Sequence, residues 1–292
     1  MVKRRVGVMV SAVAIAAVAL AGCTTPPKLP LGAQCEPLQL IPNADLTNCD
    51  LHDMDLTGVD LHGAILTNVN MTFTILDGAN LDDTVGFAAQ FQYSSMVGTS
   101  IRSAGIPIAK LHGTDLTGAD FTDTQMDGAT FDNATLTDAS FANVDLRNVV
   151  TTGWNFAAGD FSGVNLTGKT LTSNNLVGAR LAGANLSGTH LENKTATGAD
   201  FAGANLFGAA ANNANFTGSS FAGGSLDTAV VDLANFSNAN LSNASLQQIV
   251  ARQANFTGAT LTGAVFGEPS DFTGALCPSG ALYPGGDPAC LG

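Results

Sequence analysis

A large apolar residue returns at every fifth position from residue 41 to residue 266, without a single insertion. Of the 46 positions in this series, which we call the centres, 41 hold Leu, Ile, Val, Met or Phe. The residue two before a centre is usually small, and the residue one before it is often Asp or Asn. A period of five matches neither a helix nor a strand, so the pattern indicates a repeat architecture.

Two successive copies show the motif: Asp115-Leu116-Thr117-Gly118-Ala119 and then Asp120-Phe121-Thr122-Asp123. This pattern resembles the pentapeptide-repeat family, whose motif reads Ala-Asp/Asn-Leu-x-x, over about three-quarters of the chain. The resemblance implies an all-β fold, a right-handed quadrilateral parallel β-helix of about eleven coils with four pentapeptides per coil. The centre and the small residue would point inward, while Gly, Asn or Asp two after the centre would suit a corner with left-handed backbone.

Positions 20 residues apart test the four-per-coil arrangement independently, because they would stack in successive coils. Nine of the twelve Phe centres fall into two adjacent columns: Phe121, Phe141, Phe161, Phe201 and Phe221 in one, and Phe156, Phe216, Phe236 and Phe256 in the other. A third column, which begins at Leu46, is mostly Leu. This sorting of side-chain size predicts a coil of 20 residues.

Residues 1–22 match the pattern of a bacterial lipoprotein signal peptide, with a basic start and an apolar stretch too short to span a membrane comfortably. The stretch ends Leu20-Ala21-Gly22-Cys23, which resembles a lipobox. The resemblance implies that Cys23 carries diacylglycerol, with further acylation such as palmitate, after cleavage of the leader. We therefore expect a lipoprotein anchored at the extracytoplasmic face of a membrane, with residues 23–40 as a tether and N-terminal closure.

Four further cysteines flank the repeats: Cys35, Cys49, Cys277 and Cys290. In an exported, oxidising setting they allow three disulfide connectivities. About eleven coils would separate the two ends by roughly 50 Å, whereas bridged Cα atoms lie within about 7 Å. This favours Cys35–Cys49 and Cys277–Cys290, the latter within a Pro/Gly-rich cap at residues 267–292. A metal site is the alternative for either pair, although neither has the close spacing of a zinc motif.

The sequence gives little support for catalysis, because the unbroken register leaves no inserted loop between residues 41 and 266. The histidines occupy scattered outward positions, without metal-ligand spacing on one face: His52, His62, His112 and His190. One column of acids never places two carboxylates on adjacent coils: Asp60, Asp120, Asp160 and Asp200. We expect a protein that is not an enzyme and that needs no metal, cofactor or small-molecule substrate.

Acidic residues dominate the formal charge, which is −13 for the whole chain. Sixteen acids and four bases lie between residues 24 and 150, against eight and four from residue 151 onward. Such a surface repels nucleic acid and anionic lipid headgroups and attracts basic partners. The alternative is that the acids only solvate the surface, since the repeat itself favours Asp or Asn before each centre.

Two groups of residues depart from the repeat. Outward positions in the second to fourth coils carry large apolar side chains that could form an interaction patch: Ile65, Phe73, Phe87, Tyr93 and Ile108. They are either a partner surface or local packing. Trp154, Asn174 and Lys194, with Lys169 nearby, occupy inward small-residue positions, where we expect a bulge that turns them outward. That irregularity is either structural or a docking notch.

These observations favour a monomeric, non-enzymatic envelope lipoprotein that acts as a scaffold or protein-interaction module, bound to the membrane through its lipid and to an unknown envelope protein. The alternative is an acidic DNA-mimicking inhibitor of a nucleic-acid enzyme such as gyrase, as the resemblance implies for some family members. Export and the lack of a C-terminal dimerisation element count against this alternative, and we expect no direct binding of nucleic acid. A hydrolase is a distant third.

Overall fold

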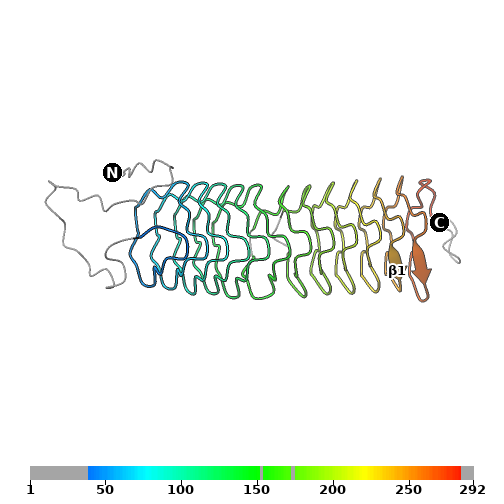
Figure 1. Ribbon diagram of the computed structural model, residues 1–292. Coiled ribbons are helices and arrows are strands. Elements are labelled where there is room, and N and C mark those ends of the chain that lie inside the picture. The colour runs from blue at the N-terminus through cyan, green and yellow to red at the C-terminus, as the bar shows by residue number, and fades with distance from the viewer. Residues whose placement is uncertain (1–38, 152–153, 172–174, 284–292) are drawn as a thin grey trace, which may run out of the picture. The chain divides into compact units, whose positions relative to one another are not determined.

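The computed structural model describes residues 39–151, 154–171 and 175–283. The chain falls into two compact units, an N-terminal unit that ends at Thr135 and a C-terminal unit that begins at Leu136. Within the described residues each unit is a succession of coils built from short strands and turns, with no helix (Figure 1). Two segments are long enough to be named as strands, β1 (Ser245–Gln247) and β2 (Val265–Gly267), and they pair in parallel.

Successive coils within each unit are joined by short parallel bridges between residues that are mostly 20 apart. In the N-terminal unit Asp45 pairs with Ile65, and Ile65 pairs in turn with Val85. Leu46 N–H donates to Ile65 O, and Ile65 N–H donates to Ala44 O, both at 2.8 Å. The predicted coil of four pentapeptides is therefore confirmed inside each unit, while the hand of the β-helix and the number of coils stay predictions.

Each pentapeptide contains one tight turn that bends the chain at a corner. In the turn after Leu46, the Cys49 N–H donates to Leu46 O at 3.0 Å, and Asn48 has a φ of 60°. Positive φ recurs at this place, two residues after the centre, throughout both units. A turn with positive φ at its third residue favours Gly and Asn, which explains the Gly, Asn and Asp found there.

The residue before each centre satisfies the backbone of the same turn. Asp115 Oδ1 accepts hydrogen bonds from the Thr117 N–H at 3.1 Å and from the Thr117 hydroxyl at 2.7 Å. Asn215 Oδ1 accepts the same pair of bonds from Thr217 at 3.1 and 2.6 Å. A carboxylate oxygen and an amide oxygen accept this hydrogen bond equally well. The turn therefore explains why Asp or Asn is frequent at this position.

Nearly all centres and the small residues two before them are buried, as the repeat predicts. The core of the N-terminal unit is mostly Leu, Ile and Met, whereas the core of the C-terminal unit combines Leu with nine buried Phe. Phe201 stacks on Phe221 with ring centroids 4.8 Å apart, and Phe216 stacks on Phe236 at 5.1 Å. The Phe columns seen in the sequence are therefore aromatic ladders in the structure.

Trp154 points into the core, so the expectation that a bulge turns it outward is wrong. Its side chain is only 5% exposed, and its ring lies 5.1 Å from Phe141 and 5.9 Å from Phe156, measured between centroids. The centre three residues earlier is Thr151, which is much smaller than the Leu or Phe usually found at a centre. The indole fits inside because this small centre leaves volume in the core.

Lys194 is also buried, at 7% exposure, and the same expectation is wrong for it. The neighbouring centre is Ala196, which again leaves room for a long side chain. Burial disfavours the charged ammonium and lowers the pKa of Lys194. The third residue of the group, Asn174, lies outside the described residues.

Parallel pairing continues beyond Phe266, within the segment 267–292 that the sequence analysis assigned to a cap. Two parallel bridges follow it with a spacing of 21 residues: Val250 with Asp271, and Asn255 with Leu276. One extra residue next to Glu268-Pro269 is absorbed there, and Phe272 returns to the core with 3% exposure. An antiparallel bridge between Leu276 and Leu282 then folds the chain back on itself.

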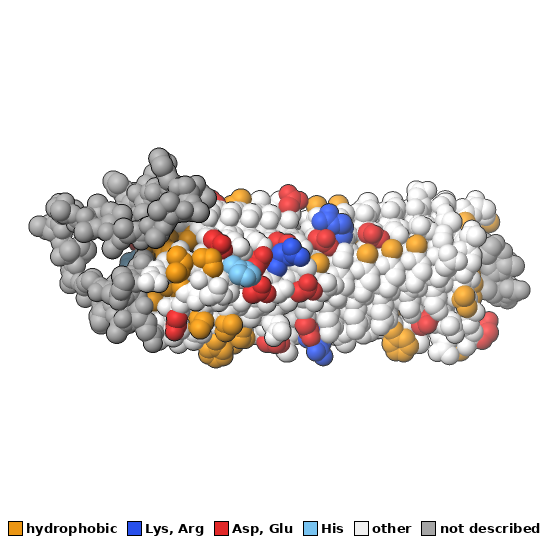
Figure 2. All heavy atoms as spheres, in the orientation of Figure 1, with side chains coloured by type: hydrophobic (Ala, Val, Ile, Leu, Met, Phe, Trp, Pro, Cys, Tyr) orange, Lys and Arg blue, Asp and Glu red, His pale blue; other side chains and the backbone are white. Residues whose placement is uncertain are grey.

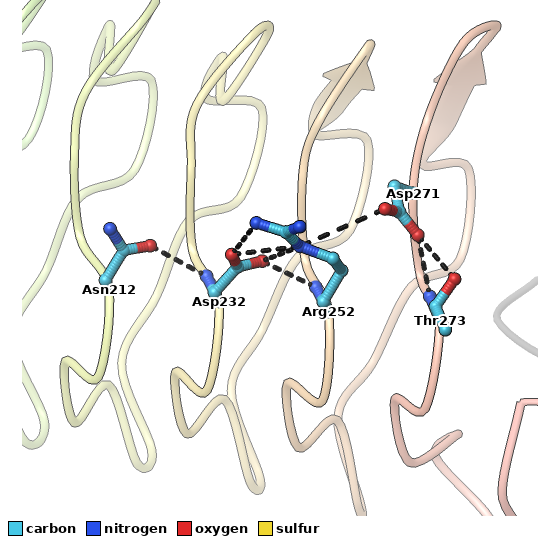
Figure 3. Close-up of polar contacts among 5 residues, drawn as sticks. All are labelled: Asn212, Asp232, Arg252, Asp271 and Thr273. Atoms are coloured by element: carbon cyan, nitrogen blue, oxygen red, sulfur yellow. Dashed lines mark hydrogen bonds and ion pairs between the residues drawn. The ribbon is translucent and has the colours of Figure 1, made fainter.

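A polar cluster joins the last coils across this extra residue (Figure 3). The Arg252 guanidinium pairs with the Asp232 carboxylate, and the Arg252 backbone N–H also donates to that carboxylate at 2.9 Å. Arg252 Nε lies 3.9 Å from Asp271 Oδ2. Asn212 Oδ1 in turn accepts the Asp232 N–H at 3.1 Å. A hydrogen bond from the Thr273 hydroxyl, aided by the Arg252 charge, lowers the pKa of Asp271. The cluster therefore fastens the terminal coil by charge as well as by backbone bonds.

Candidate interaction surface

The structure places all five residues of the predicted patch at the surface of the N-terminal unit. Figure 2 shows exposed apolar side chains interspersed with acidic ones. Val85, which the sequence analysis did not select, lies on the bridge next to Ile65 and is equally exposed. We call the following six residues, which are 39–54% exposed, the apolar surface: Ile65, Phe73, Val85, Phe87, Tyr93 and Ile108.

Aromatic side chains stack along one corner of this unit. Phe73 and Tyr93 occupy the same turn position in successive coils, with ring centroids 5.2 Å apart and planes 11° from parallel. His112 meets the Tyr93 ring edge-on at 5.2 Å. The next residue in the column is Gly113, where a Cβ would approach Tyr93 Cδ1 to 2.7 Å. The Tyr93 ring therefore lies over a glycine and against Phe73, which holds it in place.

A second corner carries the other four residues of the apolar surface. Ile65 and Val85 pair across successive coils through their backbones. Phe87 lies two residues after Val85, and its carbonyl accepts the Asn68 N–H at 2.8 Å. Ile108 follows in the next coil, and its Cγ2 lies 2.9 Å from where a Cβ would stand on Gly128. Val85 occupies the position just before a centre, as Ile65 does, so the sequence contained the signal that would have found it.

Three members of the apolar surface are at the positive-φ position of a turn: Phe73 at 58°, Tyr93 at 60° and Ile108 at 50°. For a residue with a Cβ this conformation costs roughly 1–2 kcal/mol, and a β-branched residue is especially unusual there. Most other turns meet the requirement with Gly, Asn or Asp. The N-terminal unit thus holds large apolar side chains outward at a conformational cost, which the fold alone does not require.

The apolar surface follows a strongly acidic coil. Residues 41–60 contain no Lys or Arg and five aspartates: Asp45, Asp50, Asp53, Asp55 and Asp60. Asp50 accepts hydrogen bonds from the Asn70 amide at 2.8 Å and pairs with His52 at 2.7 Å. In the part of this unit that the structure describes, Lys and Arg occur only further along the chain, at Arg102 and Lys110.

The irregular region of the C-terminal unit contains a cavity of about 340 Å³ lined by residues 147–151, Lys169 and Thr170. Lys169 Nζ donates to Val149 O at 2.6 Å, and burial lowers the pKa of Lys169 although Asp145 opposes the shift. Arg147, which also lines the cavity, pairs with Asp145 at 2.7 Å. The Lys169 ammonium and the Arg147 guanidinium therefore both contact groups of the chain itself. The docking notch stays an interpretation.

The predicted covalent sites fall largely beyond what the structure describes. Cys49 and Cys277 are buried and each is disulfide-bonded. Cys35 and Cys290 lie outside the described residues, so the pairing of the four cysteines stays a prediction. Cys23 and the whole signal peptide also lie outside them, and lipidation likewise stays a prediction.

Among residues 39–283, apart from the five inside that range that the structure leaves out, no three His, Cys, Asp or Glu side chains come together as a metal site. The same part of the chain contains no helix long and apolar enough to cross a membrane. His52, His62 and His190 are exposed, and His112 is half-buried beside Tyr93. Their ion pairs are local, as in His190 with Glu192 at 3.0 Å.

Comparison with known structures finds other proteins of the same repeat type. HetL from Nostoc sp. strain PCC 7120, a pentapeptide repeat protein involved in heterocyst differentiation regulation, is 25% identical over 83% of this chain and 92% of its own, with a TM-score of 0.40. QnrB1, a plasmid-mediated fluoroquinolone resistance protein, is 18% identical over 65% and 70%, with a TM-score of 0.32. A pentapeptide repeat protein of the Arabidopsis thaliana thylakoid lumen is 25% identical over 41% and 72%, with a TM-score of 0.19.

No curated protein sequence matches the chain. The family model described as pentapeptide repeats matches it in eight copies, over residues 43–72, 64–102, 109–150, 155–193, 186–223 and 234–268. These segments make up more than half of the chain, and they coincide with the coils that the structure forms from four pentapeptides each. The chain therefore belongs to the pentapeptide repeat family.

Proposed function

We propose that this protein is a non-enzymatic, lipid-anchored interaction module of the cell envelope, whose partner is a protein that covers the apolar surface. The observation that carries the proposal is the exposure of six large apolar side chains on neighbouring coils of one unit. Three of them also hold a strained turn conformation. Exposed apolar side chains are ordinary when isolated, but grouped ones typically mark an interface.

The C-terminal unit supplies the comparison that makes this grouping informative. Among the residues of this unit that the structure describes, no two large exposed apolar residues share a column, since no two are separated by a multiple of 20: Val150, Val177, Phe207, Leu233, Val265 and Leu282. In the N-terminal unit Ile65 and Val85 share one column, and Phe73 and Tyr93 share another. The same repeat therefore scatters exposed apolar residues in the C-terminal unit and groups them in the N-terminal unit.

The anchor follows from the lipobox resemblance at Cys23. The first described residue, Gln39, lies sixteen positions after Cys23, so an extended tether reaches at most about 55 Å. The N-terminal unit would thus work close to the membrane surface. Its acids are repelled by anionic headgroups, which favours a neighbouring protein over the lipid itself as the partner.

The absence of enzymatic activity is part of the proposal. Many of the aspartates that the structure describes accept hydrogen bonds within turns, as Asp115 does from Thr117. The cavity at Lys169 has its ammonium bonded to a backbone carbonyl. An acid–base site needs a poised, accessible pair of groups, and neither place offers one. Turnover by the purified mature protein in a broad substrate screen would contradict this point.

A crosslinking pull-down from membranes tests the proposal. The wild type is compared with a Phe87→Ser, Tyr93→Ser double variant, which removes two aromatic anchors without entering the core. We expect loss of the specific crosslinked partner, because burying one such side chain is worth roughly 1.5–3 kcal/mol. A Phe207→Ser, Leu233→Ser variant is the matched control, since it removes equally exposed residues from the C-terminal unit.

Identical partners at identical yield for all three proteins, with intact folds by circular dichroism, would exclude the apolar surface. Attention would then move to the cavity beside Lys169. The anchor is tested separately: a Cys23→Ala variant should lose lipid labelling and leave the membrane fraction, and retention of both would contradict the lipoprotein assignment.

The alternative is an acidic mimic of DNA that inhibits a nucleic-acid enzyme such as gyrase. One observation favours it: the N-terminal unit uses Asp at turn positions where Asn performs the same role in the C-terminal unit. Its charge thus exceeds what the turns require. Purified mature protein is added to a DNA supercoiling assay; inhibition that disappears when the acids are replaced by Asn would support the mimic, and no effect at saturating protein would reject it.

A further inference from the structure

We infer that the apolar surface accepts a basic amphipathic segment of a protein partner, with the Lys or Arg residues of that segment lying over the acidic first coil. This inference rests on the proposed function and adds the chemical class of the partner. The apolar side chains of the segment would cover Val85, Phe87 and Tyr93. Its cations would meet Asp45 and Asp53, which share columns with Ile65 and Phe73, and Asp50, which lies between those columns.

Charge complementarity selects this occupant over a neutral or acidic one. The first coil has five Asp and no Lys or Arg, and it is bonded directly to the coil that begins the apolar surface, as in the Asp45–Ile65 bridge. The next coil adds Asp77, and the coil after it adds Asp82 and Asp83. An apolar surface with negative charge at one end favours a partner segment that is positively charged at one end. The repulsion of like charges also sets which way that segment runs along the coils.

The acids of the first coil are not needed in ionised form by the fold. Four of them, Asp45, Asp50, Asp55 and Asp60, stand before a centre, where Asp45 Oδ1 accepts the Thr47 N–H at 3.0 Å. Asn165 accepts the equivalent Thr167 N–H at 3.2 Å in the C-terminal unit. The turn is therefore satisfied without a charge, so the negative charge of the first coil is not a requirement of its turns.

The aromatic corner adds a further preference for cations. The Phe73 ring is stacked on Tyr93 on one side, and the register places Asp53 at the same turn position one coil earlier. A guanidinium or ammonium of the partner could pair with this carboxylate beside the ring, and aromatic rings attract cations. Asp53 is exposed and stands at positive φ, as Phe73 does.

Coil spacing sets the length of the segment. Coils are about 4.8 Å apart, so the three coils of the apolar surface cover roughly 15 Å, or about ten residues of a helix. A complete segment needs about one further turn to place its cations over the first coil. We therefore expect about fourteen residues, with apolar residues at helical spacing and the basic residues gathered at one end.

Fluorescence anisotropy with a defined probe tests the inference. The probe is a labelled peptide of about fourteen residues with Leu and Phe on one helical face and Lys at one end. The matched peptide has Glu in place of Lys. Each is titrated with the full mature protein in nanodiscs of zwitterionic lipid, and binding to empty nanodiscs is subtracted.

We expect the Lys peptide to bind, the Glu peptide to bind at least about tenfold more weakly, and salt to weaken the first selectively. The Phe87→Ser, Tyr93→Ser variant should lose at least about tenfold in affinity. An Asp45→Asn, Asp50→Asn, Asp55→Asn, Asp60→Asn variant should lose affinity at low salt while its melting curve stays unchanged. The Phe207→Ser, Leu233→Ser control should bind as the wild type does.

Equal binding of the Lys and Glu peptides, or unchanged binding by the Asp→Asn variant, would overturn the inference. So would a wild-type dimer in sedimentation that the Phe87→Ser, Tyr93→Ser variant abolishes, because the surface would then be covered by a second copy. If the membrane pull-down still loses its partner in that double variant while the Lys peptide does not bind, only the partner class is wrong. If the pull-down is also unaffected, the proposed function fails as well.

Discussion

The N-terminal unit carries thirteen acidic and two basic residues in its described part, whereas the C-terminal unit carries nine and five. Both units use the same coil and the same turn, in which the residue before a centre accepts the N–H two residues later. The N-terminal unit fills this position with six Asp and two Asn, and the C-terminal unit with three Asp and nine Asn. The difference shows that the repeat leaves surface charge free to vary.

The interiors differ as much as the surfaces. The N-terminal unit has three Phe among its buried centres, Phe91, Phe121 and Phe131, and the C-terminal unit has long stacks of them. Conversely, the N-terminal unit exposes aromatic residues at its corners. The C-terminal unit thus packs most of its described aromatic side chains into the core and exposes Phe207, whereas the N-terminal unit exposes three: Phe73, Phe87 and Tyr93. The four predictions below test this comparison, from the largest expected effect to the smallest.

Phe221→Ala should produce the largest loss of stability. The Phe221 ring stacks on Phe201 at 4.8 Å and meets Phe216 and Phe236 edge-on at 5.2 and 5.6 Å. Removing a buried ring of this kind costs about 3–5 kcal/mol, because the cavity cannot collapse. Chemical denaturation followed through Trp154, the only Trp of the chain, measures the loss in the C-terminal unit.

The matched change in the N-terminal unit is Leu116→Ala, at an equally buried centre. It should lower stability by less and leave the Trp154 transition in place, since repeat proteins unfold through neighbouring coils. Equal shifts of the Trp154 transition in the two variants would show that both units unfold as one. The stabilities of the two units could then not be compared separately.

Lys194→Met should stabilise the C-terminal unit at pH 7 by about 1 kcal/mol, because Met fills the same space without a buried charge. Burial lowers the pKa of Lys194 below its usual 10.5. The wild type should therefore gain stability as pH rises toward 10.5, where the unfolded chain still binds the proton that the folded chain has lost. The advantage of Met should shrink over that interval in melting experiments, and a constant difference would contradict the assignment.

Ile108→Asn should raise stability by up to about 1 kcal/mol while weakening partner capture. Ile108 holds a φ of 50°, which Asn adopts with less strain than a β-branched residue. Leu233→Asn, at a φ of 61° in the C-terminal unit, is the control that should gain stability without touching capture. Thermal melts and the membrane pull-down measure the two effects. Loss of stability at both positions would show that the positive φ of Ile108 and Leu233 does not strain the backbone.

Arg252→Ala should have the smallest effect, confined to the terminal coil. The amides of Ala251 and Gln253 donate to Asp271 O and Thr273 O, and their hydrogen exchange should become faster. Since the pKa of Asp271 is lowered, its stabilisation is present above its usual value of 3.8 and is lost as pH falls through the folded pKa. The same amides should therefore lose protection in acid.

Arg102→Ala is the control for this change in the N-terminal unit. Arg102 approaches Asp120 only to 3.7 Å, both side chains are well exposed, and such pairs contribute little. Its removal should leave exchange almost unchanged. A larger effect at Arg102 than at Arg252 would mean that the terminal cluster does not fasten the last coil.

Much of the fold could be predicted from the sequence, because each pentapeptide repeats the same local solution. The centres, the corners and the 20-residue coil all follow from side-chain size and from turn conformation, as at Leu46 and Asn48. The outward position of Phe87 and Tyr93 followed from the same register. Their role in binding could not follow, because exposure is a property of the chain and recognition depends on a second molecule.

The errors came from positions where one side chain compensates for another. Trp154 was expected outside, since an inward position normally takes a small residue, yet the small centre at Thr151 makes room for it. Lys194 is buried in the same way, because the small centre at Ala196 makes room for it. The extra residue near Pro269 interrupts the five-residue register, although a sheet can absorb one residue and continue. A rule applied to one column at a time misses such compensation between columns.

The turn position before each centre has a consequence for how such a chain evolves. A single base change converts an Asp codon into an Asn codon or the reverse, and the hydrogen bond to the turn survives either way. Surface charge can therefore drift by one unit per mutation, coil by coil, without passing through an unfolded intermediate. Selection for a partner of given charge can act on this solenoid almost independently of selection for its folding.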